Sequence, residues 1–112
     1  MLPKINRLTK KSDFDLVFKK GEGLKNNSLI FKILKNYLNK PRFGFVVSKK
    51  VSNKATVRNK VKRRLRKAVL DNLKNIKKSV DIVIITLPGI EKKEFLDIKN
   101  AISETFEKLK LI

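Results

Sequence analysis

The feature that most constrains this chain is a long central stretch that carries positive charge and no negative charge. Between Glu22 and Asp71 there is no acidic residue, whereas Lys and Arg recur throughout. A surface that serves solubility alone mixes both signs of charge. Any fold of this stretch must bury an apolar face and still spread cations over its surface, and such a one-signed surface is typical of phosphate binding.

The whole chain shares this imbalance, with 29 Lys and Arg against 10 Asp and Glu and a formal net charge of +19 over 112 residues. A compact domain with that charge repels itself unless a polyanion lies nearby. Nucleic acid is the commonest such partner, and an anionic membrane surface is the rarer one. We expect no membrane partner, because no segment approaches the roughly 18 apolar residues of a membrane span and the N-terminus lacks a signal-peptide pattern.

The chain has no Cys and no His. Their absence excludes disulfides, thiolate metal sites and nucleophile–base pairs built on either residue. It fits a reducing cytoplasm, where we expect the protein to reside. The length predicts a single domain over residues 1–112.

Changes in the hydrophobic pattern predict six elements. In chain order they are a helix over 10–20, strands over 28–38 and 42–48, a helix over 56–74, a strand over 79–87 and a helix over 91–110. Helices mixed with a small sheet indicate an α+β protein, built as a two-layer α/β sandwich.

Local signals refine two of these elements. Ser12 is the predicted N-cap of the first helix, with Asp15 in capping-box position and Gly21 just past its end. The run Ile82-Val83-Ile84-Ile85 predicts a central strand that is buried on both faces.

The helix over 56–74 is the most informative segment. One apolar stripe repeats every four residues: Val57, Val61, Leu65, Val69 and Leu73. Two polar rows are predicted to lie away from this stripe, namely Arg58, Lys62 and Arg66, and Asn59, Arg63 and Lys67. Arg and Lys neutralise phosphates and release counterions, so the helix is predicted to bind nucleic acid rather than to be merely a solvated face.

Phe14 and Phe18 fall on one face of the first helix. Exposed aromatic rings stack on unpaired bases, but rings at helical spacing also form cores, and the pattern alone favours neither reading.

Catalytic groups are hard to find in the chain. A protein nuclease needs clustered carboxylates for metal ions or a general base such as His. The carboxylates here are scattered along the chain. Those of the last helix alternate with Lys residues, a pattern that is typical of a solvent-exposed helix face. We therefore expect no catalytic residue and no metal site in this chain.

Three sequence blocks follow one another along nearly the whole chain. The first is Arg7-Leu8 followed by Phe14, Val17, Phe18 and Gly21. The second is Arg42-Phe43-Gly44-Phe45-Val46-Val47-Ser48-Lys49-Lys50-Val51. The third is Arg58-Asn59-Lys60-Val61-Lys62-Arg63-Arg64-Leu65-Arg66. In this order the blocks resemble the bacterial ribonuclease P protein family, and the third resembles its "RNR" motif.

The chain departs from the family pattern at three places. Lys60 stands where the motif usually has Arg, which keeps the charge and loses bidentate geometry. Lys67 stands where an acidic or polar residue often follows the motif. Lys32 lies near a strand position where an aromatic residue frequently faces the family's cleft.

The resemblance implies an accessory subunit of the endoribonuclease that removes the 5′ leader of precursor tRNA. The catalytic centre would be the RNA subunit with its Mg²⁺ ions, the protein would bind no cofactor itself, and one protein would pair with one RNA. The residues that would dock on the catalytic RNA are Arg58, Asn59, Lys60, Lys62, Arg63 and Arg66. Those that would hold the single-stranded leader are Phe14, Phe18, Ser48, Lys49 and Lys50.

The implied fold is the one named after the second domain of ribosomal protein S5, with a left-handed β-α-β crossover that chirality rules do not predict.

Three alternatives remain open at the level of sequence. A structural, ribosomal-type RNA-binding protein would share the basic helix and need no leader cleft. A DNA-binding module would place that helix in the major groove, although no helix-turn-helix or heptad pattern is visible. A protein-only nuclease lacks the residues it needs.

Overall fold

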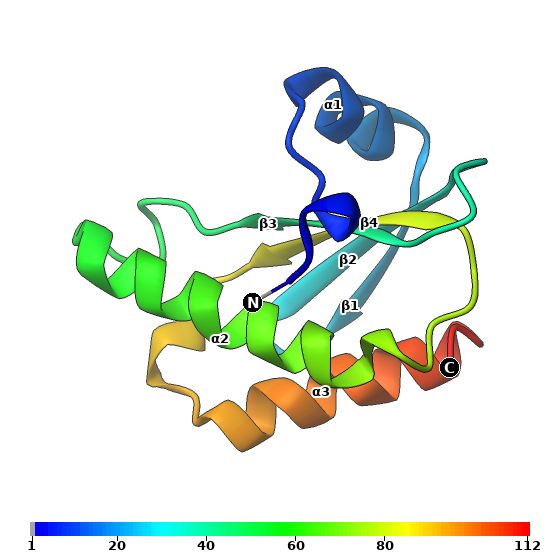
Figure 1. Ribbon diagram of the computed structural model, residues 1–112. Helices are drawn as coiled ribbons and strands as arrows, with labels where there is room; N and C mark the ends of the chain where they lie inside the picture. The colour runs from blue at the N-terminus through cyan, green and yellow to red at the C-terminus, as the bar shows by residue number, and fades with distance from the viewer. Residues whose placement is uncertain (1) are drawn as a thin grey trace.

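All six predicted elements form, each within a few residues of its predicted range (Figure 1). The computed structural model describes residues 2–112. Its elements are η1 (Lys4–Asn6), α1 (Lys11–Lys20), β1 (Glu22–Asn26), β2 (Leu29–Lys35), β3 (Arg42–Val46), α2 (Ala55–Leu73), β4 (Val80–Thr86), η2 (Ile90–Lys92) and α3 (Phe95–Lys108).

The four strands form one mixed sheet in the order β1-β2-β4-β3. β2 pairs antiparallel with both β1 and β4, and β3 pairs parallel with β4. β4 is therefore a central strand, and Ile82, Val83 and Ile84 are fully buried, which confirms the prediction from their apolar run. α2 connects the parallel strands β3 and β4, while the left-handed sense of this crossover stays a prediction.

β1 was not predicted from the sequence. Its residues, Glu-Gly-Leu-Lys-Asn, are mostly of types that strands disfavour. The strand exists because it pairs with β2 through a tight hairpin, in which Asn27 adopts a left-handed φ of 55°. The pairing supplies what local propensity lacks.

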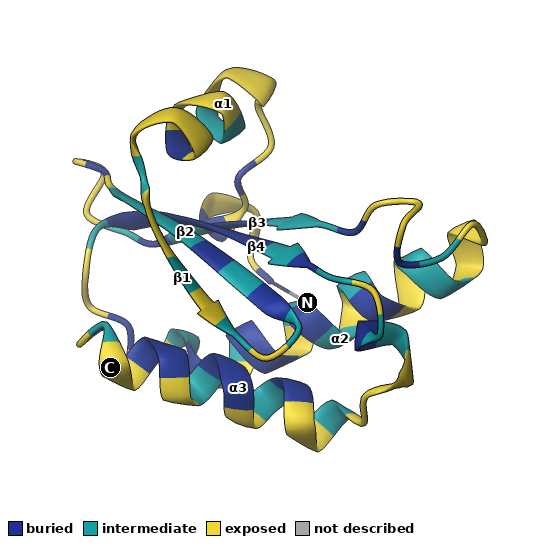
Figure 2. Cartoon of the chain, turned by 180° about the vertical axis from the view of Figure 1, so that it is seen from behind, coloured by how far each residue is buried: buried dark blue, intermediate teal, exposed yellow. Residues whose placement is uncertain are grey.

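The prediction of two layers is wrong in one respect, because helices cover both faces of the sheet (Figures 1 and 2). α2 and α3 pack on one face, where the large core includes Phe31, Phe43 and Phe106. α1 packs on the other face, where Val17 is fully buried beside Val83. β4 is apolar on both faces, so both faces need cover.

The predicted N-cap of α1 is also wrong, whereas Gly21 does stand just past the end of the helix, as predicted. Lys10 is the N-cap residue, no side chain caps the helix, and Ser12 lies exposed within the first turn. Gly21 ends the helix in an extended conformation, with φ of −75°, rather than a left-handed one. Glycine is needed there for space, since a Cβ would overlap the carbonyl oxygen of Val17 and press on the backbone of Ile33.

One polar network joins α1, the β2–β3 turn, β3 and β4. Arg42 forms a bidentate pair with Asp81, with Nε to Oδ1 at 2.8 Å and Nη2 to Oδ2 at 2.7 Å. Arg42 also reaches Asp13 of α1 at 3.4 Å, and the amide of Asn36 donates to Asp81 at 2.8 Å. The pKa of Arg42 is raised, mainly by the hydrogen bond with Asp81, so its guanidinium stays charged at any working pH.

Replacement of Asp81 tests how much this network stabilises the fold. The side chain of Asp81 is 7% exposed and that of Arg42 is 20% exposed, so Asp81→Ala leaves a largely buried cation with only its longer contact to Asp13, at 3.4 Å. We expect the free energy of unfolding in urea to fall by about 3 kcal/mol. Asp71→Ala is the matched control, because its pair with Lys99 is solvent-exposed and should contribute about 0.5 kcal/mol or less. Equal losses in the two variants would contradict this account.

Candidate nucleic-acid interface

α2 buries most of its predicted stripe and exposes cations on its outer face. Val61, Leu65 and Val69 are buried in the main core, whereas Val57 and Leu73 at the two ends are partly exposed. Asn59, Lys60 and Arg63 are exposed on the outer face. No Lys or Arg of α2 forms an ion pair with any residue in the described range 2–112.

The prediction that both polar rows of α2 lie away from the core is wrong for one of them. Arg58, Lys62 and Arg66 are each half-buried, at the flank of the buried stripe. Lys62 and Arg66 line a hollow of about 160 Å³ at the edge of β3. Phe14, Phe43, Gly44 and Phe45 also line it, together with Leu2, Arg7, Leu8 and Thr9 of the N-terminal segment. We call this space the α1–α2 hollow.

Several cations of α2 have structural contacts that the sequence did not reveal. The Nη1 atom of Arg58 donates to the carbonyl oxygens of Ser52 and Asn53, at 2.9 and 3.0 Å, and so holds the β3–α2 loop against the helix. Arg64 donates to the carbonyl oxygen of Lys93 at 3.1 Å, and Lys67 lies 5.3 Å from the ring centre of Phe95. Arg58 thus positions the loop that carries Lys49 and Lys50.

Phe14 and Phe18 combine the two roles that the sequence left open. Their ring centres lie 6.4 Å apart. Phe14 is half-buried, packs on the small cluster of Leu8, Val17 and Val83, and lines the α1–α2 hollow. Phe18 is 41% exposed. Phe14 is thus partly core and partly wall of the hollow, whereas Phe18 offers its ring to the surface.

The remaining predicted leader contacts lie elsewhere. Ser48, Lys49 and Lys50 are exposed in the β3–α2 loop and do not line the α1–α2 hollow. The Ser48 hydroxyl accepts a hydrogen bond from the backbone N–H of Lys50 at 3.3 Å, and buried Val51 anchors the loop. Lys32 is half-buried in β2, opposite Gly23 and Val83, on the sheet face that α1 covers.

Gly44 is a wall residue that sequence reasoning missed. A Cβ at this position would overlap the ring of Phe14, so glycine is what lets that ring lie against β3. The signal was present, because a glycine inside an aromatic-rich strand often marks a close approach.

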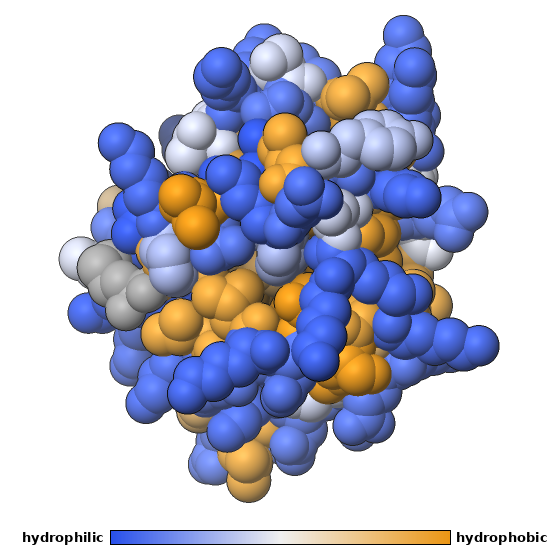
Figure 3. Space-filling view, turned by 45° about the vertical axis from the view of Figure 1, so that its right-hand side comes forward, coloured by the Kyte–Doolittle hydropathy of each residue, from blue (hydrophilic) through white to orange (hydrophobic). Residues whose placement is uncertain are grey.

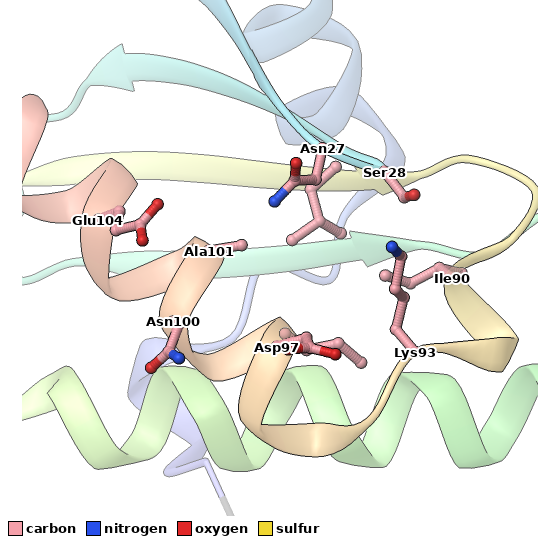
Figure 4. Close-up of a pocket in the computed structure, with 10 residues that line it drawn as sticks. Asn27, Ser28, Ile90, Lys93, Asp97, Asn100, Ala101 and Glu104 are labelled. Atoms are coloured by element: carbon pink, nitrogen blue, oxygen red, sulfur yellow. The ribbon is translucent and has the colours of Figure 1, made fainter.

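A second hollow, of about 340 Å³, lies between the β1–β2 turn and α3 (Figure 4). Asp97 and Glu104 line it together with Lys93 and amide side chains. Two carboxylates against one Lys make this space unsuited to a polyanion. Within residues 2–112 no three carboxylates gather as metal ligands, and no helix there is long and apolar enough to cross a membrane.

Comparison with known proteins assigns the family. The family model described as "Ribonuclease P" matches residues 2–110. The chain belongs to the bacterial ribonuclease P protein family. It is 40% identical to the ribonuclease P protein component of Alkaliphilus metalliredigens over 107 residues, which cover 96% of each chain. It is also 40% identical to that of Legionella pneumophila strain Corby, over 95% of this chain and 90% of the relative.

Solved structures of the family share the fold. The RNase P protein of Staphylococcus aureus superposes with a TM-score of 0.86 at 28% identity, over 95% of this chain and 96% of that one. The protein from Thermotoga maritima gives a TM-score of 0.82 at 32% identity, over 91% and 96% of the two chains. As a member of this family, the chain is the protein component of an RNA-catalysed endoribonuclease of tRNA processing, which implies association with the RNase P RNA.

The contact between Gly44 and Phe14 gives a test of the α1–α2 hollow. Gly44→Ala should lower the free energy of unfolding by about 1–3 kcal/mol, because the new methyl group displaces a packed ring. In a Phe14→Ala background the same change should cost little, and a double-mutant cycle measures the difference. Losses that add without coupling would show that Phe14 does not rest on Gly44.

Proposed function

We propose that this chain binds two RNAs through two regions of its surface. The outer face of α2 docks on the catalytic RNA, and α1 with the adjoining sheet holds the single-stranded 5′ leader of precursor tRNA. The observation that carries the proposal is the unpaired cationic face of α2 beside a hollow that has both an aromatic and a cationic wall. Family membership supports the same assignment.

The docking face on α2 consists of Asn59, Lys60 and Arg63. All three are exposed, and the described chain offers no carboxylate partner to the two cations. Such cations bind phosphates with an affinity that depends on salt rather than on sequence. Arg58 supports this face by fixing the β3–α2 loop, and its other N–H groups are left for phosphate.

The leader region combines stacking and charge. The exposed ring of Phe18 and the half-buried ring of Phe14 offer π-faces to unpaired bases, while Lys49 and Lys50, in the β3–α2 loop outside the α1–α2 hollow, contact the strand's backbone farther along. This combination holds a single strand with little sequence preference, which suits leaders of varied sequence. Lys62 and Arg66 lie at the border of the two regions, where their charge lowers the repulsion between the two RNAs.

Catalysis in this proposal belongs to the RNA. Its reacting groups and Mg²⁺ ions lie in the RNA subunit, and one protein per RNA contributes binding energy. The decisive experiment is cleavage of a precursor tRNA at low Mg²⁺ by a bacterial ribonuclease P RNA, with and without this protein. Cleavage that needs both components supports the proposal. Cleavage by the protein alone, or no effect of the protein together with tight binding to another RNA, contradicts it.

Phe18→Ala separates stacking from folding better than any change at Phe14. Because Phe18 is 41% exposed, we expect its loss to lower the free energy of unfolding by less than about 1 kcal/mol. Binding of precursor tRNA to the assembled complex should weaken by about 1–3 kcal/mol, the value of one base–aromatic stack. Binding of mature tRNA is the control and should not change. A loss of folding without a loss of precursor binding would make Phe18 a core residue only.

Arg63 and Arg64 are neighbours in sequence with opposite expected behaviour. Arg63 is exposed, so Arg63→Ala should lower the slope of log affinity for the catalytic RNA against log salt by about 1. Arg64 donates to the carbonyl oxygen of Lys93, so Arg64→Ala should instead lower the free energy of unfolding by about 1 kcal/mol and lower that slope by less than Arg63→Ala does. Salt titrations of both variants, with urea unfolding alongside, check the pair. Equal changes in slope would refute the assignment.

A further inference from the structure

Tyr37 presents an aromatic ring to solvent from a turn that is held rigidly. Tyr37 is 85% exposed, more than any other aromatic residue in the described part of the chain. The turn is fixed by Asn36, which is 8% exposed and whose amide donates to Asp81 at 2.8 Å and to the carbonyl oxygen of Lys40 at 3.2 Å. The Asn36 side-chain oxygen accepts from the backbone N–H of Leu38 at 3.0 Å. The backbone that carries this exposed ring is thus held in place, which lowers the entropic cost of a contact outside the chain.

A hollow of about 660 Å³ lies at the same end of the sheet, where β2 ends and β4 begins. Ile33, Val80, Leu109 and Leu111 give it an apolar floor. We call it the end hollow. It lies toward the right-hand side of Figure 1, and Figure 3, which brings that side forward, shows apolar surface enclosed by hydrophilic side chains.

The rim of the end hollow is cationic. Lys20, Lys35 and Lys78 line it, and Glu22 is its one carboxylate. The side chain of Lys35 also reaches Tyr37, with Nζ 5.8 Å from the ring centre. Lys35 therefore joins the ring to the hollow. Cations around an apolar floor, with an aromatic ring at the margin, match the requirements of an unpaired nucleic-acid strand.

α1 connects the end hollow to the proposed leader region. Phe14 and Phe18 lie on this helix, and Lys20 is its last residue and a wall of the end hollow. The ten residues of α1 span about 15 Å. Arg42 ties the start of α1 to the base of the Tyr37 turn through Asp13 and Asp81, so the two surfaces keep a fixed spacing.

We propose that the end hollow, with Tyr37 as its stacking platform, binds nucleotides of the 5′ leader that lie beyond those held against Phe14 and Phe18. The inference rests on the proposed function and extends it. A strand that leaves the two rings along α1 reaches Lys20 first, then Lys35 and Tyr37. Long leaders thereby gain affinity that short leaders lack.

The test is a series of precursor tRNAs with progressively shortened leaders, bound to the complex of this protein with ribonuclease P RNA. Tyr37→Ala should weaken binding of long-leader precursors by about 5- to 100-fold and leave short-leader precursors unchanged. Tyr37→Phe keeps the π-face and should bind as the wild type does. The double variant Lys35→Ala, Lys78→Ala keeps the Tyr37 ring and removes two cations of the rim. It should also reduce only the affinity that long leaders gain over short ones. Leu96→Ala and Lys108→Ala, at exposed positions of α3, are matched controls.

The outcomes separate the two proposals. If the wild type gains affinity from short leaders but Tyr37→Ala changes nothing, the end hollow does not bind the leader, although the proposed function stands. A loss that is equal for all leader lengths and for mature tRNA would place Tyr37 on the tRNA body or the catalytic RNA, which also overturns the inference. If the wild type gains nothing from any leader, the proposed function itself fails.

Discussion

The positions of α1 and of the Tyr37 turn relative to the sheet depend on the ion pair that Arg42 and Asp81 form where β3 and β4 begin. The two residues are 39 positions apart in sequence, and their pair joins the parallel strands β3 and β4 at the end where both strands begin. Arg42 also donates to Asp13 of α1, and Asp81 also accepts a hydrogen bond from Asn36 at the base of the Tyr37 turn. A largely buried charge pair contributes modestly to net stability, but it tolerates only one geometry. It therefore sets where the aromatic rings of α1 and the turn lie relative to the sheet.

The charge balance sets a second constraint. The few carboxylates that form ion pairs within residues 2–112 pair with Arg42 and with Lys99. The cations of α2 have no carboxylate partner there, and those that are held intramolecularly are held by carbonyl oxygens or an aromatic ring. These contacts fix their positions without neutralising them. The cationic surface keeps its charge for an external polyanion, which is what a family of RNA-associated proteins requires.

Much of this was accessible from sequence because it depends on periodicity. The stripe of Val61, Leu65 and Val69 and the run from Ile82 to Ile85 predicted α2 and the central strand. β1 was missed because pairing with β2, rather than the propensity of its own residues, creates it. The part of α2 in the α1–α2 hollow was missed because Lys62 and Arg66 meet Phe14 only after the sheet forms, and periodicity does not show which flank of a helix another element covers. The RNA contacts assigned to single residues stay predictions.

In the proposed function, the protein adds affinity for the leader rather than for the tRNA body. The most direct measurement compares the dissociation constants of precursor and mature tRNA for ribonuclease P RNA, with and without this protein, at one salt and Mg²⁺ concentration. We expect the protein to strengthen binding of the precursor and to leave binding of mature tRNA nearly unchanged. An equal gain for both RNAs would contradict it, because the leader would then contribute nothing to the interaction with this chain.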